Sequence, residues 1–212
     1  MACVMKRLRK KPADYHHGDL EPALVAAARA ILEKEGIEAL SLRAVARAVG
    51  VSPAAPYHHF ADKDALLAAV AAEGYRELTA AMEKRMTRET EPTRRFLGTG
   101  AGYVAFAAAN PALFRLMFGG SGLRYSAHAD LATAGMAAYD VLSKAAGEAA
   151  AAFGRDPATV PLTMLTAWSL VHGIAMLVLD AEVSPQAYGA RDPEALASLL
   201  LERLGNEHGL AF

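Results

Sequence analysis

Alanine occupies 48 of the 212 positions, and this abundance constrains the fold more than any other feature of the sequence. Alanine has the highest helix propensity, and runs of the β-branched residues that favour strands are scarce. A hydrophobic fraction of 53% and a net charge of −1 also exclude a chain that is disordered throughout. We therefore predict an all-α protein.

Capping residues predict two short helices close together near the N-terminus. Ser41 is a typical N-cap for a helix that ends at Gly50, and a second helix follows over 53–59. Two short helices joined across a three-residue turn that contains glycine indicate a helix-turn-helix. Pro56 removes a backbone donor inside the second helix, so we expect its start to be 3₁₀-like.

The remaining boundaries predict a second, larger helical domain. Asp62 is expected to cap a long helix, and Asn110 with Pro111 to begin a later one. We expect about nine helices in total. Residues 1–66 would form an N-terminal domain of three helices that contains the helix-turn-helix, and residues 67–212 a larger helical domain.

The charges are unevenly distributed along the chain. Residues 1–11 contain five Lys or Arg and no acid, and residues 1–60 hold nine basic against six acidic residues. Residues 61–212 hold thirteen against seventeen. A basic first quarter is typical of a nucleic-acid-binding part joined to another module, although a solvated basic tail would show the same pattern.

The sequence favours a cytoplasmic location. The single cysteine, Cys3, fits a reducing compartment, and no apolar stretch of a signal peptide follows the basic N-terminal residues. Val160 to Leu179 carries no charged residue and is long enough to cross a bilayer. It contains several polar residues and lacks a basic flank, so we interpret it as a buried or interface helix.

The helix-turn-helix places several suitable side chains near DNA. Such a motif inserts its second helix into the major groove. The methyl groups of Ala54 and Ala55 suit contacts with thymine methyls. The Tyr57 hydroxyl and the ring N–H groups of His58 and His59 can donate to phosphates. Arg43 can reach a phosphate or a base edge. Lys63, at a helix N-terminus, can bind a phosphate together with free backbone N–H groups, or it can be a plain surface lysine.

At this point the chain resembles the tetracycline-repressor (TetR) family of transcriptional regulators. The resemblance covers residues 15–66. It rests on five motifs at fixed spacing: Tyr15-His16-His17-Gly18-Asp19-Leu20, Ser41-Leu42-Arg43-Ala44-Val45-Ala46, Gly50-Val51-Ser52, Tyr57-His58-His59-Phe60 and Asp62-Lys63-Asp64-Ala65-Leu66.

The resemblance implies which residues contact a palindromic operator in double-stranded DNA. The family's phosphate contacts correspond to Ser41, Tyr57, His58 and Lys63. Its groove-facing positions correspond to Arg43, Ser52, Ala54 and Ala55. Pro56 departs from the family pattern and leaves few polar side chains to read bases, so phosphate contacts and DNA shape would carry much of the specificity.

The second domain contains residues suited to an apolar ligand site with one titratable group. They are Tyr103, Phe106, Phe114, Met117, Trp168 and His172. A stripe of aromatic residues and methionine in a helical domain is also typical of an ordinary core, and a lone histidine is often a hydrogen-bonded core residue.

A subgroup of the same family is known for a Trp-His-Gly signature, which Trp168, His172 and Gly173 match. That resemblance implies a homodimeric repressor that responds to a small-molecule effector. Residues 1–66 would then be its DNA-binding domain, and residues 67–212 its ligand-binding and dimerisation domain. In the family, the last two long helices form the dimer interface, which here would be about 160–179 and 192–207. This interface explains the uncharged helix without a membrane.

Two other functions remain open from the sequence. A helical enzyme or metal protein could use the pairs His16–His17 and His58–His59, but neighbouring residues do not share a helix face, and no nucleophile motif, phosphate loop or carboxylate pair is evident. We therefore expect no catalytic site, cofactor or metal. A carrier of hydrophobic ligands without a DNA-binding role is the second alternative.

Overall fold

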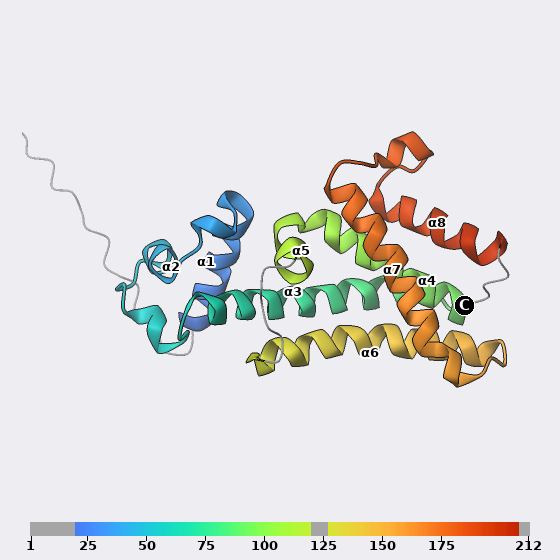
Figure 1. Cartoon of the computed structure of the whole chain (residues 1–212), viewed down its shortest axis with the longest axis horizontal. Coiled ribbons are helices and arrows are strands. Elements are labelled where there is room, and N and C mark those ends of the chain that lie inside the picture. Colours follow the sequence, from blue (N-terminus) through green and yellow to red (C-terminus); the bar gives the residue numbers. More distant parts are fainter. Residues whose placement is uncertain (1–19, 120–126, 208–212) are drawn as a thin grey trace, which may run out of the picture. The chain divides into compact units, whose positions relative to one another are not determined.

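The computed structural model describes residues 20–119 and 127–207, with side chains described as far as residue 203. The chain divides into two compact units, residues 1–66 and residues 67–212. Every regular element in the described ranges is a helix, and eight of them are α-helices (Figure 1). The prediction of an all-α protein is therefore confirmed.

The described part of the first unit, residues 20–66, contains two α-helices and two 3₁₀ helices ahead of Lys63, where the next helix begins. In chain order these are α1 (Leu20–Glu35), η1 (Ile37–Ala39), α2 (Leu42–Val49) and η2 (Ala55–His58). α1 and α2 pack against each other over a small apolar core. Its most deeply buried side chains include Leu24, Leu32, Leu40, Val45, Phe60 and Leu66.

Both ends of α2 form as the sequence predicts. The Ser41 side chain accepts a hydrogen bond from the backbone N–H of Ala44 at 3.1 Å. Gly50 adopts the left-handed conformation with φ of 82°, and the N–H of Val51 donates to the Ala46 carbonyl at 3.0 Å. Because a side chain with a Cβ disfavours this conformation, glycine ends the helix here at little cost.

The segment after the turn differs from the expected α-helix over 53–59, because the 3₁₀ conformation covers all of η2 and not only its start. Pro56 has no N–H to donate to the Ser52 carbonyl four residues earlier. That carbonyl instead accepts from the N–H of Ala55 at 3.0 Å, and the Ala54 carbonyl accepts from Tyr57 at 3.1 Å. The described residues thus contain eight α-helices where about nine helices were expected.

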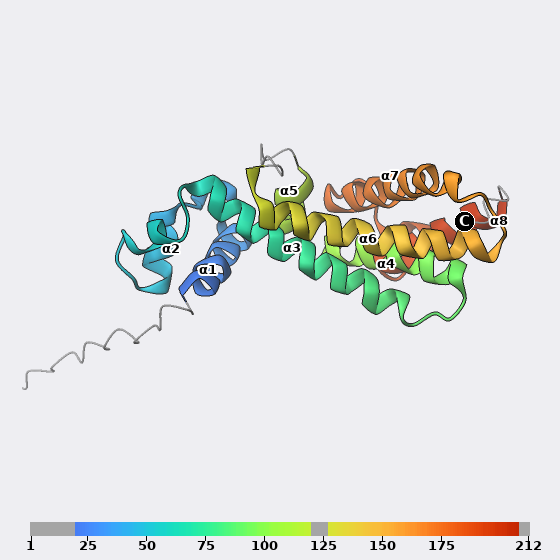
Figure 2. The same ribbon diagram turned by 90° about the horizontal axis from the view of Figure 1, so that it is seen from below.

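In the described ranges, six α-helices and two 3₁₀ helices of three or more residues follow η2. They are α3 (Lys63–Met86), α4 (Pro92–Ala109), α5 (Pro111–Phe118), α6 (Ala129–Ala152), η4 (Pro157–Thr159), α7 (Val160–Leu179), η5 (Pro185–Tyr188) and α8 (Pro193–Glu207). α3 begins at the end of the first unit and belongs mostly to the second. α4 is the central helix of the second unit, since it packs against α6, α7 and α8 (Figures 1 and 2).

Glycines in α4 allow its neighbours to approach closely. A Cβ at Gly102 would lie 2.8 Å from the Ala81 carbonyl oxygen of α3, and one at Gly100 would lie 2.9 Å from side-chain atoms of Leu201 and Val171. Both distances are far below a normal carbon contact. The small residues of α4 therefore determine how tightly α3, α7 and α8 surround it.

Candidate functional sites

The residues predicted to contact DNA lie along α2, the turn after it, η2 and the first turn of α3. Ala55 and Lys63 are half-buried. The other six are exposed: Ser41, Arg43, Ser52, Ala54, Tyr57 and His58. The first unit thus presents most of the predicted set to solvent.

Three of these exposed side chains carry polar groups that are available to an external partner. Within the described part of the chain, the side chains of Arg43, Tyr57 and His58 form no hydrogen bond or ion pair. Tyr57 is 52% exposed although it is a large aromatic residue. A guanidinium, a phenol and an imidazole without internal partners are suited to bind phosphate oxygens.

Lys63 has a structural contact that the sequence did not reveal. Its Nζ donates to the backbone carbonyl of Ile37 at 2.9 Å, which ties the start of α3 to η1. An ammonium group has three donors, so two remain for a phosphate. Asp62 caps the same helix by accepting from the N–H of Ala65 at 2.8 Å, as predicted.

The two adjacent histidines of η2 have different surroundings. His58 is exposed, whereas the Nδ1 atom of the half-buried His59 lies 3.4 Å from the Glu21 carboxylate of α1. His59 therefore holds η2 against α1. In the described ranges no group of three or more His, Cys, Asp or Glu residues is arranged to bind a metal, and His16 and His17 lie outside these ranges.

The positive charge of the N-terminal region comes mainly from its first eleven residues. Residues 20–66 hold five Lys or Arg against six Asp or Glu, while residues 1–11 hold five basic residues and no acid. The basic segment itself lies outside the described residues. The helix-turn-helix surface is therefore nearly neutral in sum, and the excess charge precedes it.

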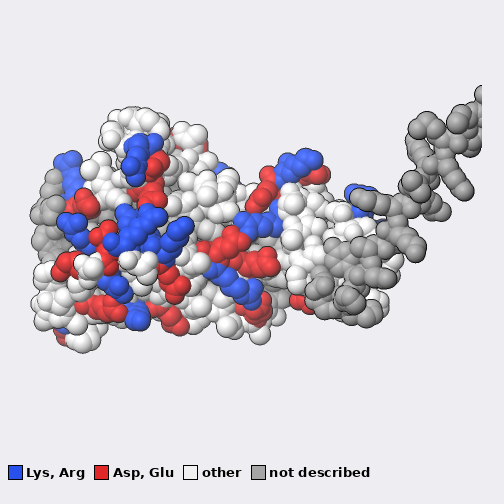
Figure 3. Space-filling model, turned by 180° about the vertical axis from the view of Figure 1, so that it is seen from behind, with Lys and Arg blue, Asp and Glu red and all other residues white. Residues whose placement is uncertain are grey.

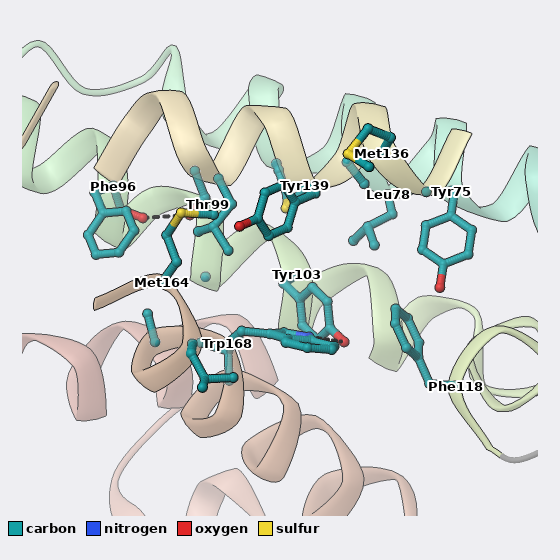
Figure 4. A pocket seen from close by; sticks show the side chains of 18 of the residues that line it. Tyr75, Leu78, Phe96, Thr99, Tyr103, Phe118, Met136, Tyr139, Met164 and Trp168 are labelled. Carbon is teal, nitrogen blue, oxygen red and sulfur yellow. Dashed lines mark hydrogen bonds between the residues drawn. The ribbon is translucent and has the colours of Figure 1, made fainter. Parts of the chain in front are cut away.

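The second unit contains a cavity of about 990 Å³. α3, α4, α6 and α7 form most of its wall, with contributions from α5 and α8. Figure 4 shows Phe96 and Met164 at one end and Tyr75 and Phe118 at the other. A volume of this size is typical of a site for a small organic molecule.

Three of the six residues predicted to bind an effector line this cavity, namely Tyr103, Met117 and Trp168. Phe106, Phe114 and His172 are not among the lining residues. Phe114 is fully buried, and its ring stacks on that of His172 with centroids 5.7 Å apart. These residues form part of the core behind the cavity wall.

A short chain of hydrogen bonds joins the wall to this core. The Trp168 Nε1–H, which can only donate, lies 3.3 Å from the Tyr103 hydroxyl oxygen. That hydroxyl lies 2.9 Å from His172 Nδ1 and can donate its own proton to it. Burial lowers the pKa of His172 below its ordinary value of 6.5, which favours the neutral ring that this donation requires.

α6 contributes residues to the cavity that were not among those predicted from the sequence. Met136 and Tyr139 line it together with Ala132, Ala138 and Leu142. These positions recur at the three- and four-residue spacing of one helix face, which is the signal that could have identified them.

α7 is the one helix in the described ranges that is long and apolar enough to cross a membrane, or one of two if α4 and α5 are counted as a bent pair. Only 28% of its most apolar 18-residue stretch is buried within the chain. Its outer face exposes Leu162 and Leu177, with Thr166 and Ser169 between them, while the exposed Leu165 also lines the cavity. The hydroxyls of both polar residues donate to carbonyls of the helix itself.

Charges on the rest of the second unit are mixed in sign, as Figure 3 shows for one face. Arg85 Nε donates to Glu194 Oε1 at 2.8 Å and so links α3 to α8. Arg95 of α4 pairs with Glu148 of α6 at 3.4 Å. These ion pairs join neighbouring helices of the second unit and neutralise part of its basic charge.

Two family models match the chain. The model described as bacterial regulatory proteins, tetR family, matches residues 24–70. The model described as a tetracyclin repressor-like C-terminal domain matches residues 96–204. No curated protein matches the chain.

Solved structures show the same relationship. A protein of unknown function from Rhodococcus sp. RHA1 is 35% identical with a TM-score of 0.78, over 94% of this chain and 100% of that one. A tetR-family regulatory protein from Rhodococcus RHA1 is 23% identical with a TM-score of 0.63, over 86% and 93%. PfmR, a TetR-family regulator from Thermus thermophilus, is 20% identical with a TM-score of 0.61, over 84% and 94%. The last two show likeness of fold alone.

The fold and the sites define a helix-turn-helix protein whose second helical unit encloses a cavity. Because the C-terminal model alone spans more than half of the chain, this protein belongs to the tetracycline-repressor family. It is a DNA-binding transcriptional regulator, and its family is one of regulators and not of enzymes.

Proposed function

We propose that the protein is a cytoplasmic, homodimeric repressor that leaves a palindromic operator when a small apolar or aromatic molecule enters the second-unit cavity. The observation that carries the proposal is the route of α3. This single helix begins at Lys63, directly after η2, and its residues Tyr75, Leu78 and Met82 line the cavity. A ligand that displaces α3 would therefore act on the end of the DNA-binding unit.

On the DNA side, Arg43, Tyr57 and His58 are the side chains that contact the operator most directly, because they are exposed and have no internal partner among the described residues. Ser41 and Lys63 add phosphate contacts with their remaining donors. Ser52, Ala54 and Ala55 allow the backbone to approach the groove floor. The basic residues at positions 1–11 add phosphate contacts that do not depend on base sequence.

The dimer would form through α7 and α8. Leu162 of α7 is 70% exposed, and Leu177 of α7 and Leu199 of α8 are also exposed. None of these three leucines lines the cavity. Burying these leucines against a second copy of the chain removes apolar surface from water, which stabilises the dimer. A homodimer also provides two helix-turn-helix motifs, one for each half of a palindrome.

The DNA half of the proposal is tested by a gel shift on the DNA upstream of the protein's own gene, at one fixed salt concentration. The proposal expects a shift at concentrations well below those needed for unrelated DNA of equal length. Equal affinity for both DNAs would contradict it and would leave a ligand carrier as the better description. Adding naphthalene or dodecanol as probe ligands tests the effector half, for which loss of the shifted band is expected.

A further inference from the structure

The described residues that line the cavity are uncharged, and their tyrosine phenols are weakly polar groups that stay protonated in ordinary side-chain chemistry. Among the described residues, its wall contains no Asp, Glu, Lys, Arg or His, and most of it is aliphatic or aromatic. Transferring an ionised group into such surroundings without a partner is strongly unfavourable, because the group loses its hydration and gains nothing in return. The cavity is therefore suited to an uncharged molecule.

Several polar groups of the wall are already engaged by the protein. The Tyr103 hydroxyl accepts from Trp168 Nε1 and lies 2.9 Å from His172 Nδ1. The hydroxyl of the buried Thr99 donates to the Phe96 carbonyl at 2.7 Å. A ligand oxygen would have to compete with these bonds.

Tyr139 of α6 is different. It lines the cavity, and its hydroxyl forms no hydrogen bond with any residue that the structure describes. Figure 4 shows the hydroxyl directed into the space between Thr99, Met164 and Tyr103. Because Tyr139 is 52% exposed, it lies where solvent reaches the cavity, so it can exchange water for a ligand oxygen.

The cavity is also elongated. On α6 its lining residues extend from Ala132 to Leu142, and on α7 from Pro161 to Val171. At about 1.5 Å per residue, ten residue steps of helix span roughly 15 Å. Figure 4 shows the labelled side chains spread along α6.

We propose that the effector is an uncharged, elongated and mostly apolar molecule with one hydroxyl or carbonyl oxygen that hydrogen-bonds to Tyr139. This inference rests on the effector site proposed above and adds the chemical class of its ligand. Fatty alcohols, esters and ketones belong to this class. Ionised fatty acids of the same length do not.

The test compares dodecanol with dodecanoate, at a pH where the carboxylate is ionised and at concentrations where neither aggregates. Trp168 is the only tryptophan of the chain and lines the cavity, so its fluorescence reports binding directly. We expect dodecanol to bind at least about 100-fold more tightly than dodecanoate. Equal or tighter binding of dodecanoate would overturn the inference.

A pair of variants tests the role assigned to Tyr139. Tyr139→Phe should weaken dodecanol binding about fivefold, which is the usual net effect of one hydrogen bond. Tyr188→Phe removes a hydroxyl from an exposed tyrosine that does not line the cavity, and should change nothing. Unchanged affinity in Tyr139→Phe would overturn the assignment.

Naphthol separates this inference from the proposed function. If naphthol binds and dodecanol does not, the elongated class is wrong while an effector site remains. If dodecanol, dodecanoate and naphthol all leave Trp168 fluorescence unchanged, both the inference and the effector half of the proposed function are contradicted.

Discussion

Ser41 caps α2 with its hydroxyl oxygen, and under the proposed function the same hydroxyl also contacts a phosphate. Its oxygen accepts from the Ala44 N–H at the start of α2, while its proton remains free to be donated to a phosphate. The cap was predictable from sequence because a serine before an apolar helical repeat is a local signal. The contact of Lys63 with the Ile37 carbonyl was not, because it joins residues far apart in sequence.

Replacing Ser41 should therefore reduce stability as well as DNA affinity. We expect Ser41→Ala to lower the free energy of unfolding by about 1 kcal/mol through loss of the cap. Ser52→Ala is the matched control, since its exposed hydroxyl forms no hydrogen bond with the described residues, and should stay within about 0.5 kcal/mol. Urea unfolding measures both, and equal effects would show that Ser41 is not a cap.

His172 makes stability depend on pH. Above its ordinary pKa of 6.5 the ring is neutral in both the folded and the unfolded chain, and pH has no effect through it. Because burial lowers its pKa in the folded chain, protons bind preferentially to the unfolded chain once the pH falls below 6.5. The free energy of unfolding should then decrease until the pH falls below the folded-state pKa.

Urea unfolding between pH 8 and pH 5 checks this dependence, with pH values chosen about the usual histidine range. His172→Gln should remove much of the decrease in the free energy of unfolding at acid pH. His58→Gln should keep that decrease, because His58 is exposed and has no partner among the described residues. The same slope in all three proteins would contradict the account of His172.

At the scale of whole elements, the close approach of α3 to α4 depends on Gly102. A Cβ there would meet backbone atoms of Ala81 and Met82, which cannot rotate away. We expect Gly102→Ala to destabilise the protein by about 1–3 kcal/mol. In Gly147→Ala of α6 the new methyl meets nothing within 4 Å, so the better helix propensity of alanine should add about 0.5–1 kcal/mol.

Thermal unfolding distinguishes the two glycine variants by the sign of the change in Tm. A rise or no change in Gly102→Ala would show that α3 and α4 can separate without loss, and would weaken the argument that α4 determines the packing of the second unit.

The elements themselves were largely predictable, since their boundaries follow from local residues. α5 begins at Pro111 as expected, but Asn110 does not cap it; its Nδ2 donates instead to the Phe106 carbonyl at the end of α4. For η2, Pro56 predicted a departure from α-helical hydrogen bonding, but the sequence did not show that the 3₁₀ conformation would cover the whole segment. The three predicted ligand residues outside the cavity wall show a further limit, because the direction of a side chain depends on packing between helices.

At the scale of the whole molecule, α7 has more apolar surface than this chain buries. We expect Leu162→Asp to weaken the proposed dimer at least about tenfold, because a carboxylate would have to be buried in an apolar interface. Phe153→Asp introduces the same charge at a similarly exposed apolar residue outside α7 and α8. Sedimentation equilibrium measures both dissociation constants, and equal weakening would place the interface elsewhere.

The charge distribution also becomes clear only at this scale. The near-neutral total of −1 is the sum of a basic first quarter and an acidic remainder. The helix-turn-helix itself adds little to the excess, so the proposed operator recognition would depend on a few well-placed side chains such as Arg43 and Tyr57, and less on general attraction.

The most direct test of the central claim, that this regulator binds its operator through the α2–η2 surface, is the affinity of two arginine variants for the upstream DNA. Arg43→Ala and Arg191→Ala change the net charge equally, but Arg191 lies in the second unit with its side chain 87% exposed. At one salt concentration, fluorescence anisotropy should show at least about fivefold weaker binding for Arg43→Ala and less than about twofold for Arg191→Ala. Equal affinities for the two variants would contradict the account.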